Sequence, residues 1–449
     1  MNTYEAIVYD LGDVLFSWSV QTKSSIPSEL VKQILSSEVW QDYERGYFAE
    51  DECYKKISEA FDLDALEVKK AIQDVRQSLK VDNANISKEE YVYLRKLPAD
   101  WNLFEHVFVS GDIGMREPGV CFYEHVLKNI GVRPEKVIFV DEKLENVMSA
   151  QSLGMKGIQF QDPESLAQIL ENLLGDSVRR GEEFLMKNTG KFHSVSDNGV
   201  EILENFSQLL ILDITHDESL VQLKRPNREW KFFIEEPRET TKTFPNDLDT
   251  TSTALRVLPH KDSHINFMLD KMLKYVTAEG LVQTYFDNNR PRFDPIVNIN
   301  VLHIFHKYSR GQDLSTSMNW VRQILYHRAY LAGTRYYPSP DAILYFFTRL
   351  WEVIDDPNLK VKLRYLLTER TIERKGVNGT ALCIAMRLSA GHTLGVQNKT
   401  DLETLRMMQH RDGGWEAGHL YKFGSSDLDM GNRGLATALA VQVMREGAS

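Results

Sequence analysis

The sequence predicts two domains of different class, an N-terminal α/β domain with a parallel sheet and a C-terminal all-α domain. Three observations lead to this prediction. At 449 residues the chain is too long for one ordinary hydrophobic core. Up to about residue 175, short apolar runs alternate with helical patterns, and two of these runs lead directly into an aspartate. From about residue 198 onward, helical periodicity dominates.

The N-terminal part contains three short apolar runs typical of buried parallel strands, at residues 4–9, 136–141 and 156–160. Asp10 follows the first run and Asp141 ends the second. Helical patterns between the runs close near a glycine, which suits a helix C-cap. We therefore expect Asp10 at the carboxyl end of a strand, where open α/β sheets bind ligands.

Two further segments define the predicted domain boundaries. Residues 20–80 show helical patterns only, which predicts a helical cap inserted after the first strand. Residues 176–197 are polar and rich in turn-forming residues, which predicts a linker. The predicted domains are therefore 1–175 and 198–449.

The C-terminal part contains nine helical candidates with short connections and no convincing short repeat. That number suits a barrel made of a double ring of helices. The candidates are residues 199–215, 262–276, 295–310, 318–331, 341–354, 360–376, 379–391, 401–410 and 433–446.

Charge and cysteine usage exclude some classes of protein. A formal net charge of −11 argues against a nucleic-acid partner, which requires a basic surface. The three cysteines are widely spaced and odd in number, so neither a disulfide framework nor a zinc site is expected. No apolar run reaches the roughly 20 residues that span a bilayer, and the first residues show no signal-peptide pattern. We expect a cytosolic protein, and the sequence indicates no oligomeric state.

The stretch FPNDLDTTSTAL, residues 244–255, places Asp247 and Asp249 one residue apart and follows them with hydroxyl side chains. An apolar pocket cannot readily hold two negative charges so close, so one carboxyl is pushed toward its neutral form. A neutral carboxyl aimed into a dry cavity is what protonation of an unactivated alkene requires, and threonine hydroxyls can orient it. The alternative is a helix N-terminus, because Asp and Thr are good capping residues.

Three N-terminal stretches, VYDLGDVLF, VFVSGDIGMREPG and VIFVDEKLENV, together resemble the haloacid dehalogenase superfamily over about residues 4–170. The resemblance implies that Asp10 is the phosphoryl acceptor. It also implies a Mg²⁺ site formed by Asp10, Gly12, Asp141 and Glu142. A phosphatase is one function that follows from it.

The N-terminal stretches also depart from the family pattern. Gly12 stands where a second aspartate is usual, and Glu117 stands where the family has a lysine, which leaves Arg116 as the nearby cation for phosphate. Residues 78–90 contain no apolar strand to carry the Ser/Thr motif of the family. Two alternatives stay open here, a working phosphatase and a degenerate domain with a structural role.

The C-terminal part carries two signatures of another family. DLDTTS resembles the Asp-x-Asp-Asp and Asp-x-Asp-Thr-Thr motifs of class II terpene cyclases. QHRDGGW, residues 409–415, resembles the Gln-Trp motif that braces the loops of squalene-hopene and plant class II cyclases. The resemblance implies that Asp249 is the general acid and that Asp247 and Thr250 position it. DDPNLK at 355–360 lacks the acid spacing of a class I metal motif and is interrupted by proline.

A cyclase cavity needs aromatic faces around its carbocations and cations for a diphosphate. For each candidate the alternative is ordinary core packing or a surface ion pair. The aromatic candidates are Phe244, Tyr285, Phe286, Trp320, Tyr336, Tyr337, Phe346, Trp415 and Tyr421, and the candidates for the diphosphate are Arg335 and Arg433.

A haloacid-dehalogenase-like domain followed by a single class II barrel resembles the drimane-type sesquiterpene cyclases over nearly the whole chain. The resemblance implies that Asp249 protonates farnesyl diphosphate, two rings close, and a deprotonation gives drimenyl or albicanyl diphosphate. Asp10 with Mg²⁺ then gives the alcohol if the N-terminal site works, and otherwise a downstream phosphatase is needed. The alternatives are a phosphatase with a helical scaffold and a non-enzymatic interaction protein.

Overall fold

The computed structural model describes residues 4–10, 14–15, 23–77, 91, 95, 100–424 and 426–447. The chain forms two compact units, Met1–Leu170 and Glu171–Ser449. Each unit has its own hydrophobic core.

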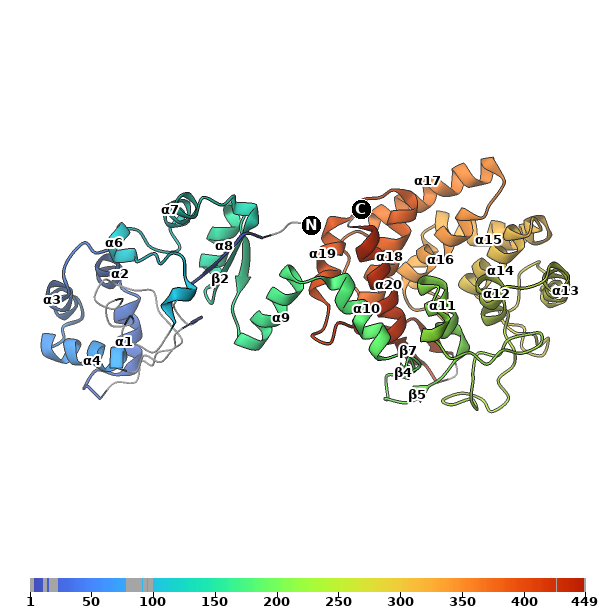
Figure 1. Ribbon diagram of the computed structural model, residues 1–449, viewed down its shortest axis with the longest axis horizontal. Coiled ribbons are helices and arrows are strands. Elements are labelled where there is room, and N and C mark those ends of the chain that lie inside the picture. Colours follow the sequence, from blue (N-terminus) through green and yellow to red (C-terminus); the bar gives the residue numbers. More distant parts are fainter. Residues whose placement is uncertain are drawn as a thin grey trace. The chain divides into compact units, whose positions relative to one another are not determined.

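The first unit contains the predicted parallel sheet (Figure 1). Strands β1 (Ala6–Tyr9), β2 (Val137–Asp141) and β3 (Lys156–Gln159) lie in the order β1-β2-β3. Helices α7 (Val120–Ile130) and α8 (Leu144–Ser152) occupy the predicted positions between strands. β2 is buried along its whole length, as expected for a central parallel strand.

Residues 23–77, within the segment predicted as a helical insertion, contain four helices. These helices pack around a separate core that includes Trp40 and Ile57. They are α1 (Ser28–Leu35), α2 (Glu38–Glu44), α3 (Glu50–Phe61) and α4 (Ala65–Gln77). Residues 78–90 and Gly12 lie outside the described residues, so the predicted absence of a strand and the predicted role of Gly12 stay predictions.

Four further helical elements among the described residues lie at the end of the first unit or within it, and the last of them, α9, continues past Leu170 into the second unit. They are η1 (Trp101–Leu103), α6 (Ser110–Ile113), η2 (Pro134–Lys136) and α9 (Pro163–Leu174).

Six helices of the second unit form a closed inner ring, in which each helix contacts the next and the last contacts the first. In order around the ring they are α11 (Asn205–Thr215), α12 (Leu248–Val257), α14 (Pro295–Lys307), α16 (Pro340–Glu352), α18 (Ala381–Leu394) and α20 (Arg433–Glu446).

Further helices pack outside this ring, which agrees with the predicted double ring. They are α10 (Ser177–Lys187) on α20, α15 (Ser315–Tyr326) on α14, α17 (Pro357–Glu373) on α16 and α18, and α19 (Lys399–Met407) on α18. The remaining helical elements are α13 (Asp262–Met272), η3 (Glu218–Leu220), η4 (Leu273–Tyr275), η5 (Gly311–Leu314) and η6 (Ala329–Ala332).

Every helix of the inner ring begins with a side chain that accepts a hydrogen bond from a backbone N–H of its first turn. Such caps satisfy donors that a buried helix end would otherwise leave unpaired. Proline follows the cap at the start of α14 and α16, where its fixed φ suits the first helical position. The capping residues are Glu204, Asp247, Asp294, Ser339, Thr380 and Asn432.

The second unit differs from the predicted all-α domain in one respect. It contains an antiparallel sheet in the order β5-β4-β7-β6, formed by β4 (Ser194–Ser196), β5 (Glu201–Ile202), β6 (Tyr421–Phe423) and β7 (Leu428–Asn432). The helix expected from residue 199 begins at Asn205, because residues 201–202 pair with β4. Strands this short leave too little period-two pattern to be predicted.

The segment predicted as a linker, residues 176–197, also differs. It contains α10, which packs on α20, and β4. Because most of its residues are polar, the sequence did not indicate that α10 is an amphipathic helix, which buries one face through Gly181, Phe184 and Leu185. A further helix, α12, was missed because its Asp, Thr and Ser residues are weak helix formers.

The Gln-Trp stretch binds three helices together, as the resemblance implies. The fully buried Trp415 donates from Nε1 to the carbonyl of Leu405 on α19, at 2.6 Å. Its backbone N–H donates to Thr437 Oγ1 on α20, at 3.0 Å. Gln409 Nε2 donates to the carbonyl of Ser177 at the start of α10, at 2.9 Å.

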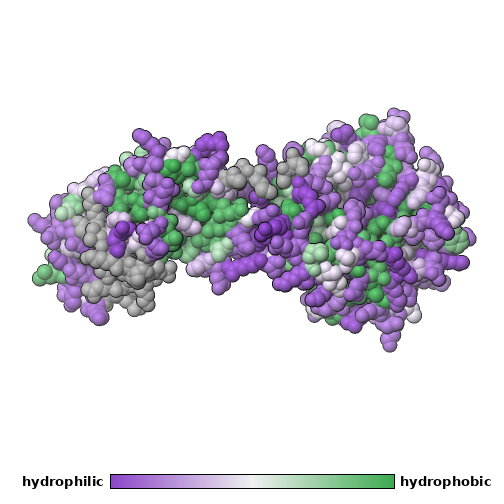
Figure 2. Space-filling model, in the orientation of Figure 1, coloured by the Kyte–Doolittle hydropathy of each residue, from purple (hydrophilic) through white to green (hydrophobic). Residues whose placement is uncertain are grey.

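On the face seen in Figure 2, the surface of the second unit is mostly hydrophilic and is interrupted by separate apolar patches. Among the described residues, no helix is both long enough and apolar enough to cross a membrane.

Replacing Trp415 tests this brace. Trp415→Ala leaves a large cavity between α10, α19 and α20, and we expect the free energy of unfolding to fall by about 3–5 kcal/mol. Urea denaturation measures it. Trp320→Ala, on the outer helix α15, is the matched control and should cost less than half as much. Equal costs at the two positions would contradict the bracing role.

Candidate active site

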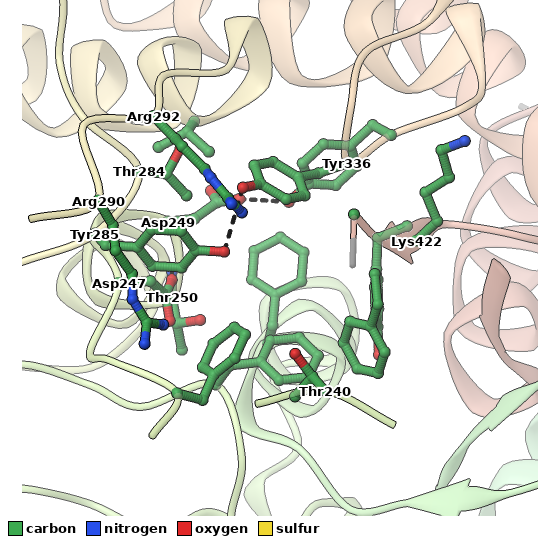
Figure 3. A pocket seen from close by; sticks show the side chains of 18 of the residues that line it. Thr240, Asp247, Asp249, Thr250, Thr284, Tyr285, Arg290, Arg292, Tyr336 and Lys422 are labelled. Carbon is green, nitrogen blue, oxygen red and sulfur yellow. Dashed lines mark hydrogen bonds between the residues drawn. The ribbon is translucent and has the colours of Figure 1, made fainter. Parts of the chain in front are cut away.

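A cavity of about 290 Å³ lies in the second unit, at the N-terminal ends of α11, α12, α14 and α16 (Figure 3). Aromatic residues are the largest group in its wall, and several rings contact one another edge to face. The aromatic lining residues are Phe206, Phe232, Phe244, Tyr285, Tyr336, Tyr337, Tyr421 and Phe423.

Asp249 lies in the first turn of α12, is buried, and lines this cavity. Asn300, on the neighbouring helix α14, donates from Nδ2 to Oδ1 at 2.7 Å. The hydroxyl of Tyr337 donates to Oδ2. Burial raises the pKa of Asp249 to about 6, although these two hydrogen bonds favour the ionised form. The carboxyl is therefore fixed in orientation and is partly protonated near neutral pH.

Asp247 caps α12 and lines the same cavity. Its Oδ1 accepts a hydrogen bond from the backbone N–H of Thr250 at 2.6 Å. Burial raises the pKa of Asp247 to about 8, and the charge of Asp249 adds to that rise. The capping and the acid-pair interpretations of the motif therefore both describe Asp247. Near neutral pH Asp247 is therefore mostly protonated, whereas Asp249 keeps its proton only in part.

The remaining hydroxyls of the motif stabilise the first turn of α12. Thr251 Oγ1 donates to the carbonyl of Asp247 at 2.7 Å and accepts from the N–H of Trp230 at 2.9 Å. Ser252 Oγ donates to the carbonyl of Asp249 at 3.0 Å. Thr250, which was predicted to position the acid, lines the cavity beside both carboxyls.

Three cations line the cavity that the sequence reasoning missed, namely Arg290, Arg292 and Lys422. Figure 3 shows the two arginines on one side of the cavity and Lys422 on the other. The backbone N–H ends of the ring helices add partial positive charge near them. The sequence feature that could have indicated Arg290 and Arg292 is the turn-rich segment NNRPRF, which lies directly before the capped helix α14.

Of the nine aromatic residues and two arginines predicted as candidates for the substrate, Phe244, Tyr285 and Tyr336 line the cavity. The hydroxyl of Tyr285 donates to that of Tyr336 at 3.3 Å. Of the other aromatic candidates, Tyr337 and Tyr421 line the cavity too.

The other six candidates are absent from the lining, and each has a local structural partner. Phe346 packs edge to face against Tyr345. Phe286 packs against Tyr275, and Trp320 against Phe293. Trp415 belongs to the brace described above. The two remaining residues are arginines.

The two arginines predicted to hold a diphosphate lie outside the cavity wall. Arg433 forms two hydrogen bonds to Asp412, at 2.7 and 2.8 Å, and lies over the ring of Phe184. Arg335 is exposed and donates to the carbonyl of Gly424, at 3.0 Å. Arg433 begins the inner-ring helix α20 and Arg335 precedes α16, so both lie near the ring, but the sequence does not show that their side chains have partners outside the cavity.

The first unit contains a second cluster, in which oxygens of Asp10, Glu117 and Asp141 lie within 4.8 Å of one another. Asp10 follows β1 and Asp141 ends β2, so adjacent parallel strands bring them together. Glu117 takes the third place that was predicted for Glu142. Glu142 instead lies 3.2 Å from Lys143 Nζ.

Burial raises the pKa of Asp141 to about 7, and the nearby Glu142 adds to the rise. Burial and the charges of Asp10 and Asp141 also raise the pKa of Glu117 well above its usual value. Buried carboxyl oxygens this close suit a hard divalent cation, which would relieve their repulsion. The residues present therefore fit Mg²⁺.

Two cations lie near these carboxyl groups. Burial lowers the pKa of Lys143, but the charges of Glu142, Asp10 and Asp141 outweigh this effect and hold that pKa above its ordinary value. Arg116, the cation predicted for phosphate, pairs with Glu44 of α2, Nε to Oε2 at 3.1 Å. Lys143 is therefore the cation that the sequence reasoning missed.

The chain is similar to known proteins over part or nearly all of its length. Residues 178–308 match the family described as sesquiterpene cyclase astC-like C-terminal domain. The drimenol cyclase drtB of Aspergillus calidoustus is 42% identical over 98% of this chain and 87% of its own length. The chain belongs to this sesquiterpene cyclase family.

The sesquiterpene phosphatase astK of Aspergillus oryzae is 32% identical over 38% of this chain and 98% of its own length. Among solved structures, a HAD family enzyme from Bacteroides thetaiotaomicron covers 36% of this chain and 98% of its own, at 17% identity and a TM-score of 0.30. The type II terpene cyclase MstE from Scytonema covers 63% of this chain and 98% of its own, at 11% identity and a TM-score of 0.44.

The raised pKa of Asp247 predicts how stability depends on pH. A carboxyl whose pKa is higher in the folded state stabilises the protein below its unfolded pKa, and this contribution is lost as pH rises to about 8. Asp247→Asn keeps a capping oxygen but cannot ionise. Relative to the parent chain, we expect this variant to gain on the order of 2 kcal/mol in free energy of unfolding between about pH 5 and about pH 8.

Urea denaturation at the two pH values measures this difference. Comparing variant with parent cancels the similar contributions of Asp141 and Glu117. A difference that stays constant with pH would contradict the raised pKa.

Proposed function

We propose that the second unit cyclises farnesyl diphosphate by protonation, giving a bicyclic drimane-type sesquiterpene diphosphate. The observation that carries the proposal is the buried carboxyl of Asp249, held by Tyr337 and Asn300 and facing an aromatic cavity. Family membership with drimenol cyclase drtB supports the same reaction class.

In this proposal Asp249 is the general acid of the DLDTT motif. Protonating an alkene requires a neutral carboxyl, and burial raises the pKa of Asp249 far enough for a fraction of this carboxyl to keep its proton near neutral pH. Asp247 shares that proton and fixes the start of α12. Tyr337 and Asn300 orient the carboxyl so that its proton points at the terminal double bond of the folded substrate.

The aromatic wall stabilises the carbocations that follow. Ring faces attract positive charge without offering a nucleophile, so rings close before the cation is captured. Phe206, Phe232, Phe244 and Tyr421 contribute faces of this kind. A final deprotonation ends the cascade, and the similarity to the drimenol cyclase drtB favours the drimenyl skeleton.

The cations Arg290, Arg292 and Lys422 hold the diphosphate, in place of the predicted Arg335 and Arg433. Arginine forks and a lysine ammonium match phosphate oxygens and leave the prenyl tail in the aromatic part. Asp356, in the sequence that was compared with a class I motif, caps α17. The diphosphate therefore stays on the substrate during cyclisation.

The first unit then removes phosphate from the bicyclic product to give the alcohol. The relationship to sesquiterpene phosphatase astK supports this step. Asp10 is the phosphoryl acceptor, and Asp10, Glu117 and Asp141 hold Mg²⁺, which when bound neutralises phosphoryl charge. Lys143 attracts the phosphate and takes the place of the family's lysine. We place both reactions in the cytosol.

Replacing the acid tests the cyclase. Asp249→Asn keeps the size and most hydrogen bonds of the side chain but has no acidic proton. We expect cyclic product from farnesyl diphosphate to fall at least about 10³-fold. Gas chromatography of extracts, after added phosphatase, measures it. Turnover that survives this substitution would favour the alternative, a phosphatase with a helical scaffold.

Replacing the nucleophile of the first unit separates the two activities. With Asp10→Asn we expect cyclisation to continue while the alcohol appears only after added phosphatase, because the phosphoryl acceptor is lost. The parent chain with Mg²⁺ is the control and should give the alcohol directly. Parent and variant giving only the diphosphate would contradict phosphatase activity in the first unit.

A further inference from the structure

A line of polar side chains runs from the acid along the two adjacent inner helices α12 and α14. On α12, Thr253 and Arg256 follow Asp249 by four and seven residues, a spacing that keeps them on one face of the helix. On α14, His303 follows Asn300 by three residues. We name Thr253, Arg256, Asn300 and His303 the polar seam.

The side chains of the polar seam are buried. Thr253 is 1% exposed and His303 7% exposed, and the side chain of Arg256 is 7% exposed. Within the described part of the chain, Thr253 Oγ1, His303 Nδ1 and Arg256 Nε have no hydrogen-bond partner. Buried polar atoms without a protein partner are normally satisfied by ordered water.

The far end of the polar seam reaches a second cavity. Arg256 pairs with Asp213 of α11, Nη2 to Oδ2 at 3.0 Å, and Arg349 of α16 pairs with the same carboxylate. Asp213 and Arg349 line a cavity of about 500 Å³ at the C-terminal ends of α11, α16, α18 and α20. The polar seam therefore extends from the acid to the opposite end of the ring.

A structural role for these cations explains only part of this arrangement. Arg256 and Arg349 lie in the last turns of their helices, where positive charge offsets the helix dipole. That role gives no reason for the buried hydroxyl of Thr253 or the buried imidazole of His303, which lie between the acid and the cations along the two helices. Leaving such groups without a partner costs stability, so a function is expected.

The proposed cyclisation requires a route by which Asp249 regains a proton in each turnover, and the polar seam can provide it. Each turnover moves the proton of Asp249 to a substrate carbon, and the final carbocation loses a proton from a different carbon. The Asp249 carboxylate must regain a proton before the next turnover, while substrate or product fills the cavity on its other side. Burial and the charges of Arg256 and Arg349 hold the pKa of His303 well below its ordinary value, so its ring is neutral. A neutral imidazole can accept a proton on one nitrogen and release one from the other.

We propose that the polar seam, together with the water that it holds, returns a proton from solvent in the second cavity to Asp249, with His303 as the relay. One proton enters from solvent for each proton that the product loses, so the reaction stays a net isomerisation. This inference rests on the proposed cyclase function. His303 is a relay residue and does not touch the substrate.

Rapid-quench kinetics with farnesyl diphosphate in excess tests the inference on the full chain with Mg²⁺. In His303→Leu, enzyme that starts with a protonated Asp249 should complete a first turnover at the parent rate. Later turnovers should slow at least tenfold, with a larger solvent deuterium isotope effect, because proton return now limits the rate. Thr253→Val, which keeps the side-chain volume, should show the same pattern and decides the question if His303→Leu folds poorly.

His306→Leu is the matched control, because His306 lies on the same helix but packs against Gly311 outside the polar seam, and it should leave both phases unchanged. Later turnovers at the parent rate in both seam variants would overturn the inference. First and later turnovers slowed equally would also overturn it, because they indicate a structural disturbance of the acid. If the parent chain gives no cyclic product, the proposed function itself fails, and the inference fails with it.

Discussion

The burial of the Asp247 and Asp249 carboxyls at the start of α12 is the constraint on which the second unit depends. Two carboxyls so close retain a proton near neutral pH only where water is excluded. The closed ring of helices provides that exclusion, and the acid is held by Asn300 of α14 and by Tyr337, which precedes α16. The acid therefore depends on the closed ring, because both carboxyls would ionise if the same residues were exposed to water.

The direction of the ring helices organises charge around this acid. Their N-terminal ends meet at the cavity, where caps such as Asp294 and Ser339 satisfy the first turns and where Arg290, Arg292 and Lys422 add full positive charge. An anionic head group is attracted to that end, and the aromatic wall accommodates the apolar tail. The C-terminal ends carry their cations at the opposite end of the ring, so both ends of the barrel are compensated.

Much of this could be predicted from the sequence, and the failures have physical causes. Strand ends fixed Asp10 and Asp141, because residues after parallel strands share one edge of the sheet. Helical periodicity found nine helices, but it reports one apolar face and does not say which helices form the inner ring. Trp320 was therefore assigned to a cavity that it does not reach, and Asn300 was overlooked among apolar neighbours. Contacts between distant segments carry no local signal.

The acidic cluster of the first unit also depends on a contact that the motif does not show. Motif comparison keeps a degenerate domain open as one alternative, because Glu117 stands where a lysine is expected. In space, Lys143 lies close enough for the charges of Asp10 and Asp141 to raise its pKa, so positive charge is supplied from another position in the chain. The electrostatic potential at the site depends on where the charges lie in space, whatever their position in the sequence. Both units thus bury carboxyl groups, one to retain a proton for an alkene and the other to attract a cation for a phosphate.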